Sequence, residues 1–166
     1  MTRRHLEVIP DLLPREFRIE QIVSGGQTGV DRAALDVAIE LNIPHGGWCP
    51  RGRRAEDGII PDCYLLREST SKHYDVRTKQ NVLDSDGTLI LYGCRLEGGT
   101  LLTANYAEQQ GKANYRVRLS GRVSFVACIE WLATKNIRIL NVAGPRASKD
   151  PQIYEKTQRF LRQLLG

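Results

Sequence analysis

A glycine-rich join between an apolar strand and a helix stands near the start of the chain: SGGQTGVDRAALDVA, residues 24–38. Gly25 and Gly26 permit a sharp turn and let backbone N–H groups come close to a ligand, because no Cβ stands in the way. A helix that starts here offers unpaired N–H groups and the positive end of its dipole to an anion. The join therefore predicts an anion-binding loop or, as the simpler alternative, a tight turn alone. Its candidate binding residues are Gly25, Gly26, Gln27, Thr28 and Gly29.

Strands and helices alternate along the rest of the chain. Apolar residues at helical spacing predict helices, and short apolar runs predict strands. Such alternation indicates a mainly parallel sheet with helices on both faces. We expect an α/β fold, a single Rossmann-like three-layer domain over residues 19–166, after an N-terminal arm at 1–18. Strands are expected at 19–23, 46–50, 63–68, 88–92, 115–119 and 137–143, and helices at 31–41, 74–83, 123–135 and 151–165. Residues 97–111 are expected to form a loop and then a helix, and residues 51–62 an irregular basic loop.

Two further strands, at 88–92 and 137–143, also lead into glycines ahead of a helix. Right-handed crossovers place the loops after parallel strands on one edge of the sheet, where open α/β sheets bind ligands. Three converging glycine joins favour an anion-binding crevice at this edge. The later two joins add the candidates Gly98, Gly99, Thr100 and Thr103, then Gly144 and Arg146, with Ser148 as a further hydroxyl donor.

Three arginines stand where a dinucleotide-binding protein carries an acidic residue for the ribose: Arg51, Arg53 and Arg54. Guanidinium groups suit bidentate contacts with phosphate, which argues against a nicotinamide dehydrogenase. For at least one of the three, a solvated basic loop is the alternative. Arg77 shares a helix face with Asn81, and we expect it either to reach the crevice or to lie on the surface.

The composition of the chain limits which other classes of protein it could belong to. The 166 residues carry a net charge of +5, with 41% hydrophobic and 26% charged residues, which is typical of a globular protein. The four cysteines are widely spaced and form no metal-binding or redox motif. The chain has neither a membrane-length apolar run nor a secretory signal, so we expect a cytoplasmic protein. Basic residues are not interleaved with aromatic ones, and we expect no nucleic-acid partner.

No complete set of catalytic residues is visible. The three histidines are scattered, and neither a GxSxG elbow nor a P-loop occurs. This favours binding over turnover. Two alternatives stay open: a nucleotide-processing hydrolase that uses Glu97 or Glu108, and a nucleotide-sensing module.

Five sequence blocks in order resemble the molybdenum cofactor carrier family, within the wider Rossmann-like group that includes the cytokinin-activating phosphoribohydrolases. The similarity runs from about Ile19 to the C-terminus. The blocks are SGGQTGVDRAALDVAI, GGWCPRGRRAEDG, YDVRTKQNV, SDGTLILYG and EGGTLLT.

The resemblance implies a homotetramer that holds the phosphorylated pterin–molybdenum cofactor and passes it to molybdoenzymes without chemistry. It places the first glycine join in an anion-binding loop and Gly98, Gly99 and Thr100 on the opposite wall, with the arginine-rich loop nearby. The phosphoribohydrolases carry a GGxGTxxE loop whose glutamate does acid–base work. Here the loop lacks one glycine, and no carboxylate follows within the next turn. The resemblance therefore implies a carrier, with a bound nucleotide phosphate as the alternative ligand.

Overall fold

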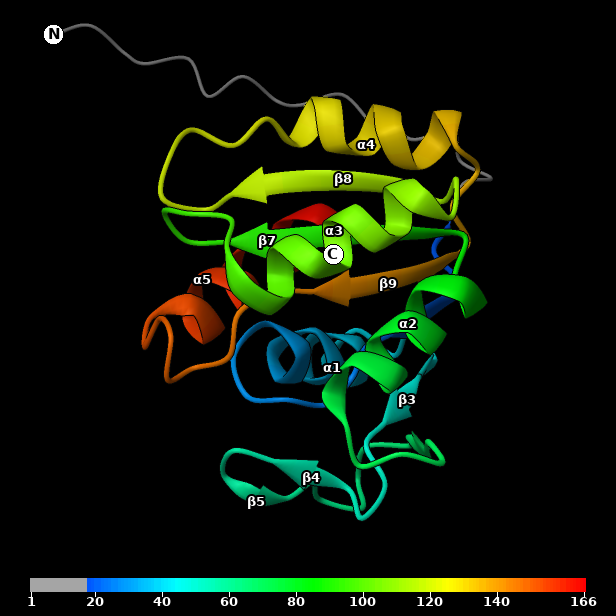
Figure 1. Ribbon diagram of the computed structural model, residues 1–166. Helices are drawn as coiled ribbons and strands as arrows, with labels where there is room; N and C mark the ends of the chain where they lie inside the picture. Colours follow the sequence, from blue (N-terminus) through cyan, green and yellow to red (C-terminus); the bar gives the residue numbers. More distant parts are fainter. Residues whose placement is uncertain (1–17) are drawn as a thin grey trace, which may run out of the picture.

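Five strands form one parallel sheet in the computed structural model, which describes residues 18–166 (Figure 1). In spatial order they are β2 (His45–Gly46), β1 (Gln21–Val23), β9 (Ile139–Ala143), β7 (Gly87–Tyr92) and β8 (Ala113–Arg118). All neighbouring strands run parallel. β7 and β9 are largely buried, as expected of apolar strands between two helix layers. The predicted Rossmann-like α/β fold is confirmed.

Within residues 18–166, five helices accompany the sheet: α1 (Val30–Glu40), α2 (Tyr74–Asp84), α3 (Gly98–Gln109), α4 (Phe125–Thr134) and α5 (Ile153–Leu165). α1, α4 and α5 bury apolar side chains against one face of the sheet in a shared core. In that core Phe125 stacks on Phe160, with the ring centroids 5.2 Å apart. α3 packs against β7 and β8 on the other face, with α2 beside it (Figure 1).

Because the strands are parallel, β1, β7 and β9 end on the same edge of the sheet. The loop that follows each of them therefore opens onto that edge. These three loops are the glycine-containing joins of the sequence, at residues 24–29, 93–97 and 144–152. The topology thus brings together segments that are more than half the chain apart.

The segment between β2 and α2 departs from the predicted strand pattern. It forms four short strands outside the central sheet: β3 (Trp48–Cys49), β4 (Arg54–Ala55), β5 (Gly58–Ile59) and β6 (Arg67–Glu68). β3 pairs with β6, and β4 with β5 makes a hairpin in place of the expected irregular loop.

The strand predicted at 63–68 was therefore wrong in its extent, since only its last two residues are extended. The physical reason lies in Tyr64, whose hydroxyl donates a hydrogen bond of 2.6 Å to Asp36 of α1. Its ring belongs to a second, smaller core together with Leu35 and Ile60. This packing holds the segment against the helix and away from the central sheet.

The expected N-terminal arm lies, apart from Arg18, outside the described residues. Across residues 18–166, no helix combines the length and apolar character needed to cross a membrane.

Candidate functional site

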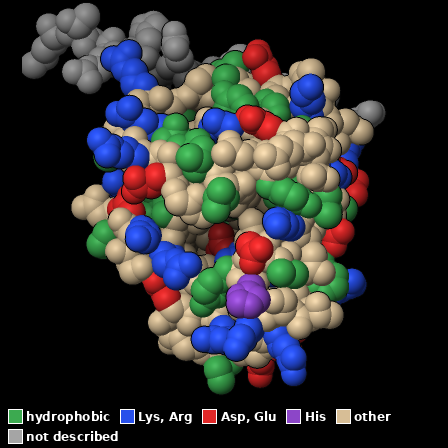
Figure 2. Space-filling view, viewed as in Figure 1, with side chains coloured by type: hydrophobic (Ala, Val, Ile, Leu, Met, Phe, Trp, Pro, Cys, Tyr) green, Lys and Arg blue, Asp and Glu red, His purple; other side chains and the backbone are tan. Residues whose placement is uncertain are grey.

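A crevice opens at the edge where β1, β7 and β9 end. Its volume is about 1090 Å³, just above the usual range for small-molecule sites, roughly 300–1,000 Å³. Figure 2 shows this face hollowed near its middle, with basic and acidic side chains around the hollow. All three glycine-containing joins line it: the first through Gly25, the second through Gly98 and Gly99, and the third through Gly144.

The first turn of α3 faces the crevice with its backbone exposed. Gly98 has a φ of +56°, which favours glycine, and neither Gly98 nor Gly99 has an atom within 4 Å of the place where a Cβ would stand. No side chain caps this helix. The Thr103 hydroxyl, one turn on, donates to the carbonyl of Gly99 at 2.9 Å. The first N–H groups of a helix lack intrahelical acceptors, so this end is suited to an anion.

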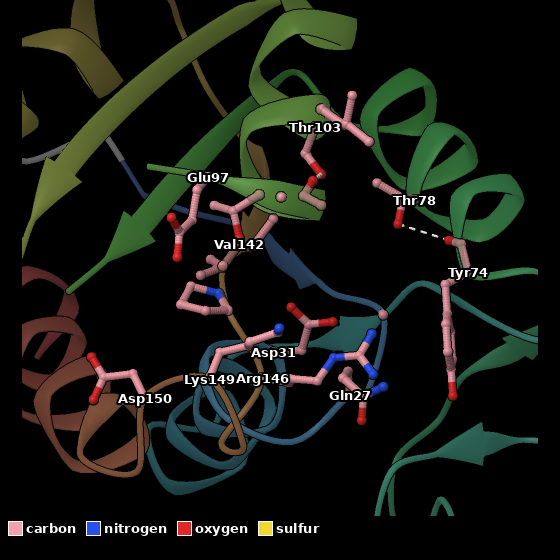
Figure 3. A pocket seen from close by; sticks show the side chains of 18 of the residues that line it. Gln27, Asp31, Tyr74, Thr78, Glu97, Thr103, Val142, Arg146, Lys149 and Asp150 are labelled. Carbon is pink, nitrogen blue, oxygen red and sulfur yellow. Dashed lines mark hydrogen bonds between the residues drawn. The ribbon is translucent and has the colours of Figure 1, made fainter. Parts of the chain in front are cut away.

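The floor of the crevice holds three polar side chains, two of which are labelled in Figure 3. Gln27 Oε1 accepts hydrogen bonds from the backbone N–H groups of Thr28 and Glu56, at 3.0 and 2.9 Å. These contacts fix the orientation of the amide. Arg77 Nη1 donates to Asp31 Oδ2 at 3.0 Å, and both side chains are nearly buried.

Gly25 is required beside this ion pair. A Cβ at Gly25 would lie 1.6 Å from Arg77 Nη1, so any other residue would displace the guanidinium. Burial raises the pKa of Asp31 above its ordinary value, and the charge and hydrogen bond of Arg77 oppose that rise. The two groups therefore hold each other in place.

Arg146 supplies a cation that lies across the crevice. Its guanidinium carbon is 5.2 Å from the centroid of the Tyr74 ring, and that of Arg77 is 5.8 Å from the same centroid. Within residues 18–166 the Arg146 guanidinium makes no hydrogen bond or ion pair, so its donors are available to a ligand. Figure 3 shows it extended toward Tyr74, with Lys149 nearby in the view.

Two glycines of the first join, Gly26 and Gly29, pack against other segments of the fold and do not line the crevice. A Cβ on Gly26 would meet Leu66 Cδ1 at 2.6 Å, and one on Gly29 would meet the carbonyl oxygen of Pro145 at 2.4 Å. That carbonyl also accepts the first N–H group of α1, from Val30, at 3.2 Å. The first N–H group of α1 is therefore already satisfied by a backbone carbonyl, and the anion expected at this helix start stays a prediction.

Thr28 and Ser148 are likewise engaged outside the crevice. Both hydroxyls donate to the carboxylate of Glu56, and Thr28 Oγ1 also accepts the N–H of Ala147 at 3.1 Å. Burial raises the pKa of Glu56, but hydrogen bonds from Ser148 and Thr28 outweigh it and leave the pKa lowered. These contacts tie the β4–β5 hairpin to the loop after β9.

The arginine-rich loop lies apart from the crevice. Arg53 donates to four backbone carbonyls, those of residues 60, 61, 64 and 66, at 3.0, 2.8, 2.9 and 3.3 Å. Arg51 and Arg54 line a separate small hollow with Lys72 and His73. The expectation that the three arginines join the crevice was wrong, because the loop folds back on its own segment through Arg53.

The predicted candidates thus divide into two groups. Those in the crevice wall are Gly25, Gln27, Arg77, Gly98, Gly99, Thr100, Thr103, Gly144 and Arg146, and those outside it are Gly26, Thr28, Gly29, Arg51, Arg53 and Arg54.

Sequence reasoning missed several residues of the wall. Tyr74 and Thr78 share a face of α2 with Arg77, and helical spacing could have joined them to it. Lys149 and Asp150 follow β9, and Cys94 and Arg95 follow β7, positions that a parallel sheet directs to the crevice. Of the two glutamates weighed for catalysis, Glu97 lines the crevice, whereas Glu108 forms an ion pair with Arg116 of β8. Residues 18–166 contain no cluster of three or more potential metal ligands of the His, Cys, Asp or Glu type.

A parallel Rossmann-like sheet with one glycine-lined crevice at its carboxyl edge defines a ligand-binding α/β protein. Residues 22–165 match the family model of the circularly permutated YpsA SLOG family, and the chain belongs to that family. It is also similar to a crystal structure from Syntrophus aciditrophicus SB named "putative molybdenum carrier protein", with 48% identity and a TM-score of 0.86. That alignment covers 89% of this chain and 96% of the other. No curated protein matches the chain. These findings confirm the predicted family resemblance.

Proposed function

We propose that the crevice binds a phosphorylated, anionic cofactor of the molybdenum–pterin type and releases it intact to a recipient molybdoenzyme. The observation that carries this proposal is the uncapped start of α3, where Gly98 and Gly99 leave open space beside free N–H groups. A phosphate placed there meets the positive end of the helix dipole. The name of the similar Syntrophus protein supports the choice of ligand class.

The rest of the crevice suits such a ligand. A volume of about 1090 Å³ accommodates a fused ring system together with its phosphate. Arg146 and Lys149 add positive charge to the wall. The cofactor's own dithiolene holds its metal, so the protein needs to contribute no metal ligand.

We propose binding without turnover. Glu108, one of the two glutamates considered as an acid, is paired with Arg116 on the outer strand, away from the crevice. A nucleotide-processing activity remains the second candidate, because Glu97 stands at the N-cap of α3 and lines the crevice. A base released from nucleoside monophosphates by the parent protein, but not by Glu97→Gln, would support the second candidate.

The main test uses cofactor released anaerobically from a molybdoenzyme. The protein is incubated with it, freed of unbound material and assayed for pterin and for molybdenum. We expect both to be retained together and the loaded protein to reactivate a cofactor-free molybdoenzyme. Retention of neither, with tight binding of an ordinary nucleotide, would contradict the molybdenum assignment.

The homotetramer and the cytoplasmic location stay predictions. Light scattering on the purified full chain tests the first, and fractionation of the native cells tests the second.

A further inference from the structure

We propose that Gln27 and Arg77 form a subsite that recognises a carbonyl oxygen on the ligand's ring, as found in pterins and in guanine. The inference rests on the proposed function and deepens it, because it names the ring class that the crevice selects and the end of the ligand that reaches the floor.

Two buried N–H donors in the floor have no acceptor. Gln27 is only 5% exposed, and its Nε2 has no hydrogen-bond partner within the described residues; the same holds for Arg77 Nε. Leaving a buried donor unpaired destabilises a protein by about as much as a lost hydrogen bond. Both residues line the crevice, so a small adjustment of their side chains on binding would present both donors to an acceptor on the ligand.

The orientation of each donor is fixed by its neighbours. Gln27 Oε1 already accepts two backbone N–H groups, so the amide cannot turn over without losing both. Arg77 is held through Nη1 by Asp31 Oδ2 at 3.0 Å. Arg77 also packs against Gly25, two residues before Gln27, which places the unpaired donors in the same part of the floor.

The charge of the floor decides which end of the ligand it receives. Gln27 is neutral, and Arg77 is paired with Asp31, so the three side chains carry no net charge. A phosphate there would lie beside the carboxylate of Asp31 and would be repelled. The start of α3, with its uncapped N–H groups, is the better place for the phosphate. The floor is left for a neutral polar edge.

A ring carbonyl oxygen fits two donors, because it has two lone pairs and no proton. Guanine presents such an oxygen at its six-position, and the oxo group of a pterin is equivalent. Adenine presents an amino group at the same place, which would set donor against donor. Sites built around such hydrogen bonds reject the analogue that cannot make them.

The experiment compares four probes by calorimetry on the full chain: a phosphorylated pterin, GMP, AMP and ribose 5-phosphate. We expect the pterin and GMP to bind more tightly than AMP by about tenfold or more. In Gln27→Glu, which keeps the acceptor oxygen but replaces the donor, this preference should disappear. The added negative charge should weaken ribose 5-phosphate and AMP by a similar factor, and GMP by a larger one.

Two further variants guard against effects on folding. Arg77→Lys keeps a cation beside Asp31 while removing Nε, and it should also abolish the preference. Gln80→Glu makes the same chemical change as Gln27→Glu at a partly buried glutamine of α2 that does not line the crevice, and it should retain the preference. Thermal unfolding of each variant reports whether the fold is intact.

The outcomes separate the two proposals. Equal binding of GMP and AMP by the parent, or an unchanged preference in folded Gln27→Glu, contradicts the inference and leaves the proposed function standing. A loss of ribose 5-phosphate binding in that variant as large as the loss of GMP binding would place the phosphate at the floor and overturn the inference. If neither the phosphorylated probes nor the molybdenum cofactor bind, the proposed function and the inference both fall.

Discussion

Gly25 faces the guanidinium of Arg77 so closely that even a methyl group would collide with it, at 1.6 Å from Nη1. In Gly25→Ala we expect Arg77 to leave Asp31, whose buried carboxylate then lacks its partner. The free energy of unfolding should fall by about 3 kcal/mol or more, the usual cost of breaking a buried pair. Ligand affinity should fall as well, because the floor loses its arginine. Urea unfolding and calorimetry measure the two effects, and a variant that matches the parent in both would contradict this account of Gly25.

Arg53 and Arg54 are neighbours with different roles. Arg53 satisfies four backbone carbonyls, whereas Arg54 is exposed beside a separate hollow. We expect Arg53→Gln to lower the free energy of unfolding by about 2–4 kcal/mol, because four carbonyls, three of them in partly buried contacts, lose their donors. Arg54→Gln should change it by less than about 0.5 kcal/mol. Denaturant titrations of both variants provide the comparison, and equal effects would mean that the Arg53 contacts do not stabilise the loop.

At the scale of the elements, a substitution at the start of α3 should affect stability and ligand binding in opposite directions. Gly99 lies within the helix and has open space at its Cβ position, so an alanine there meets no atom of the protein. Gly99→Ala should leave stability unchanged or raise it by up to about 1 kcal/mol, since alanine favours helix. The methyl group would nevertheless occupy space next to the N–H groups that we assign to the phosphate. We therefore expect weaker ligand binding by a protein of parental or higher melting temperature. Parental affinity would place the phosphate elsewhere.

The β4–β5 hairpin and the loop after β9 are joined through Glu56, which accepts hydrogen bonds from Ser148 N and Oγ at 3.0 and 2.6 Å. Its pKa is lowered from the ordinary 4.5 in the folded protein. The ionised group therefore stabilises the fold at pH values above 4.5, and this stabilisation disappears as the pH falls through the lowered pKa. Glu56→Gln should be less stable than the parent at pH 7, and the difference should shrink on acidification below about 4.5. Unfolding curves across this pH range test it, and a constant difference would contradict it.

The elements also show what the sequence can and cannot predict. Apolar runs specify β7 and β9, and the glycines after them identify the edge where the crevice forms. Pattern alone does not show that the carbonyl of Pro145 takes the first N–H group of α1, because that contact joins two distant loops. Likewise, a sequence of closely spaced arginines does not reveal that Arg53 turns inward to its own segment. Tertiary contacts of this kind determine which residues of each glycine join face the crevice.

At the scale of the whole molecule, the chain carries a modest net positive charge, and basic side chains also outnumber acidic ones in the lining of the crevice. Its ionisable residues are Arg77, Lys79, Arg95, Arg146, Lys149 and Lys156 on the positive side and Asp31, Asp75, Glu97 and Asp150 on the negative side. Arg77 is neutralised by Asp31, so the remaining cations outnumber the remaining acids. A cavity walled by protein strengthens such a field at its mouth. Anionic ligands should therefore bind more weakly as the ionic strength rises.

Arg146 should account for a large share of that salt dependence, because its guanidinium has no acceptor among the described residues and lies only against the Tyr74 ring. In Arg146→Gln we expect the affinity for a phosphorylated ligand to fall by about tenfold, the equivalent of one charge-assisted hydrogen bond. The slope of affinity against salt concentration should flatten at the same time. Arg54→Gln removes an equal charge outside the crevice and serves as the control. Titrations at two ionic strengths decide the matter: if both variants change the slope alike, the effect belongs to the overall charge of the protein, and Arg146 has no special contact with the ligand.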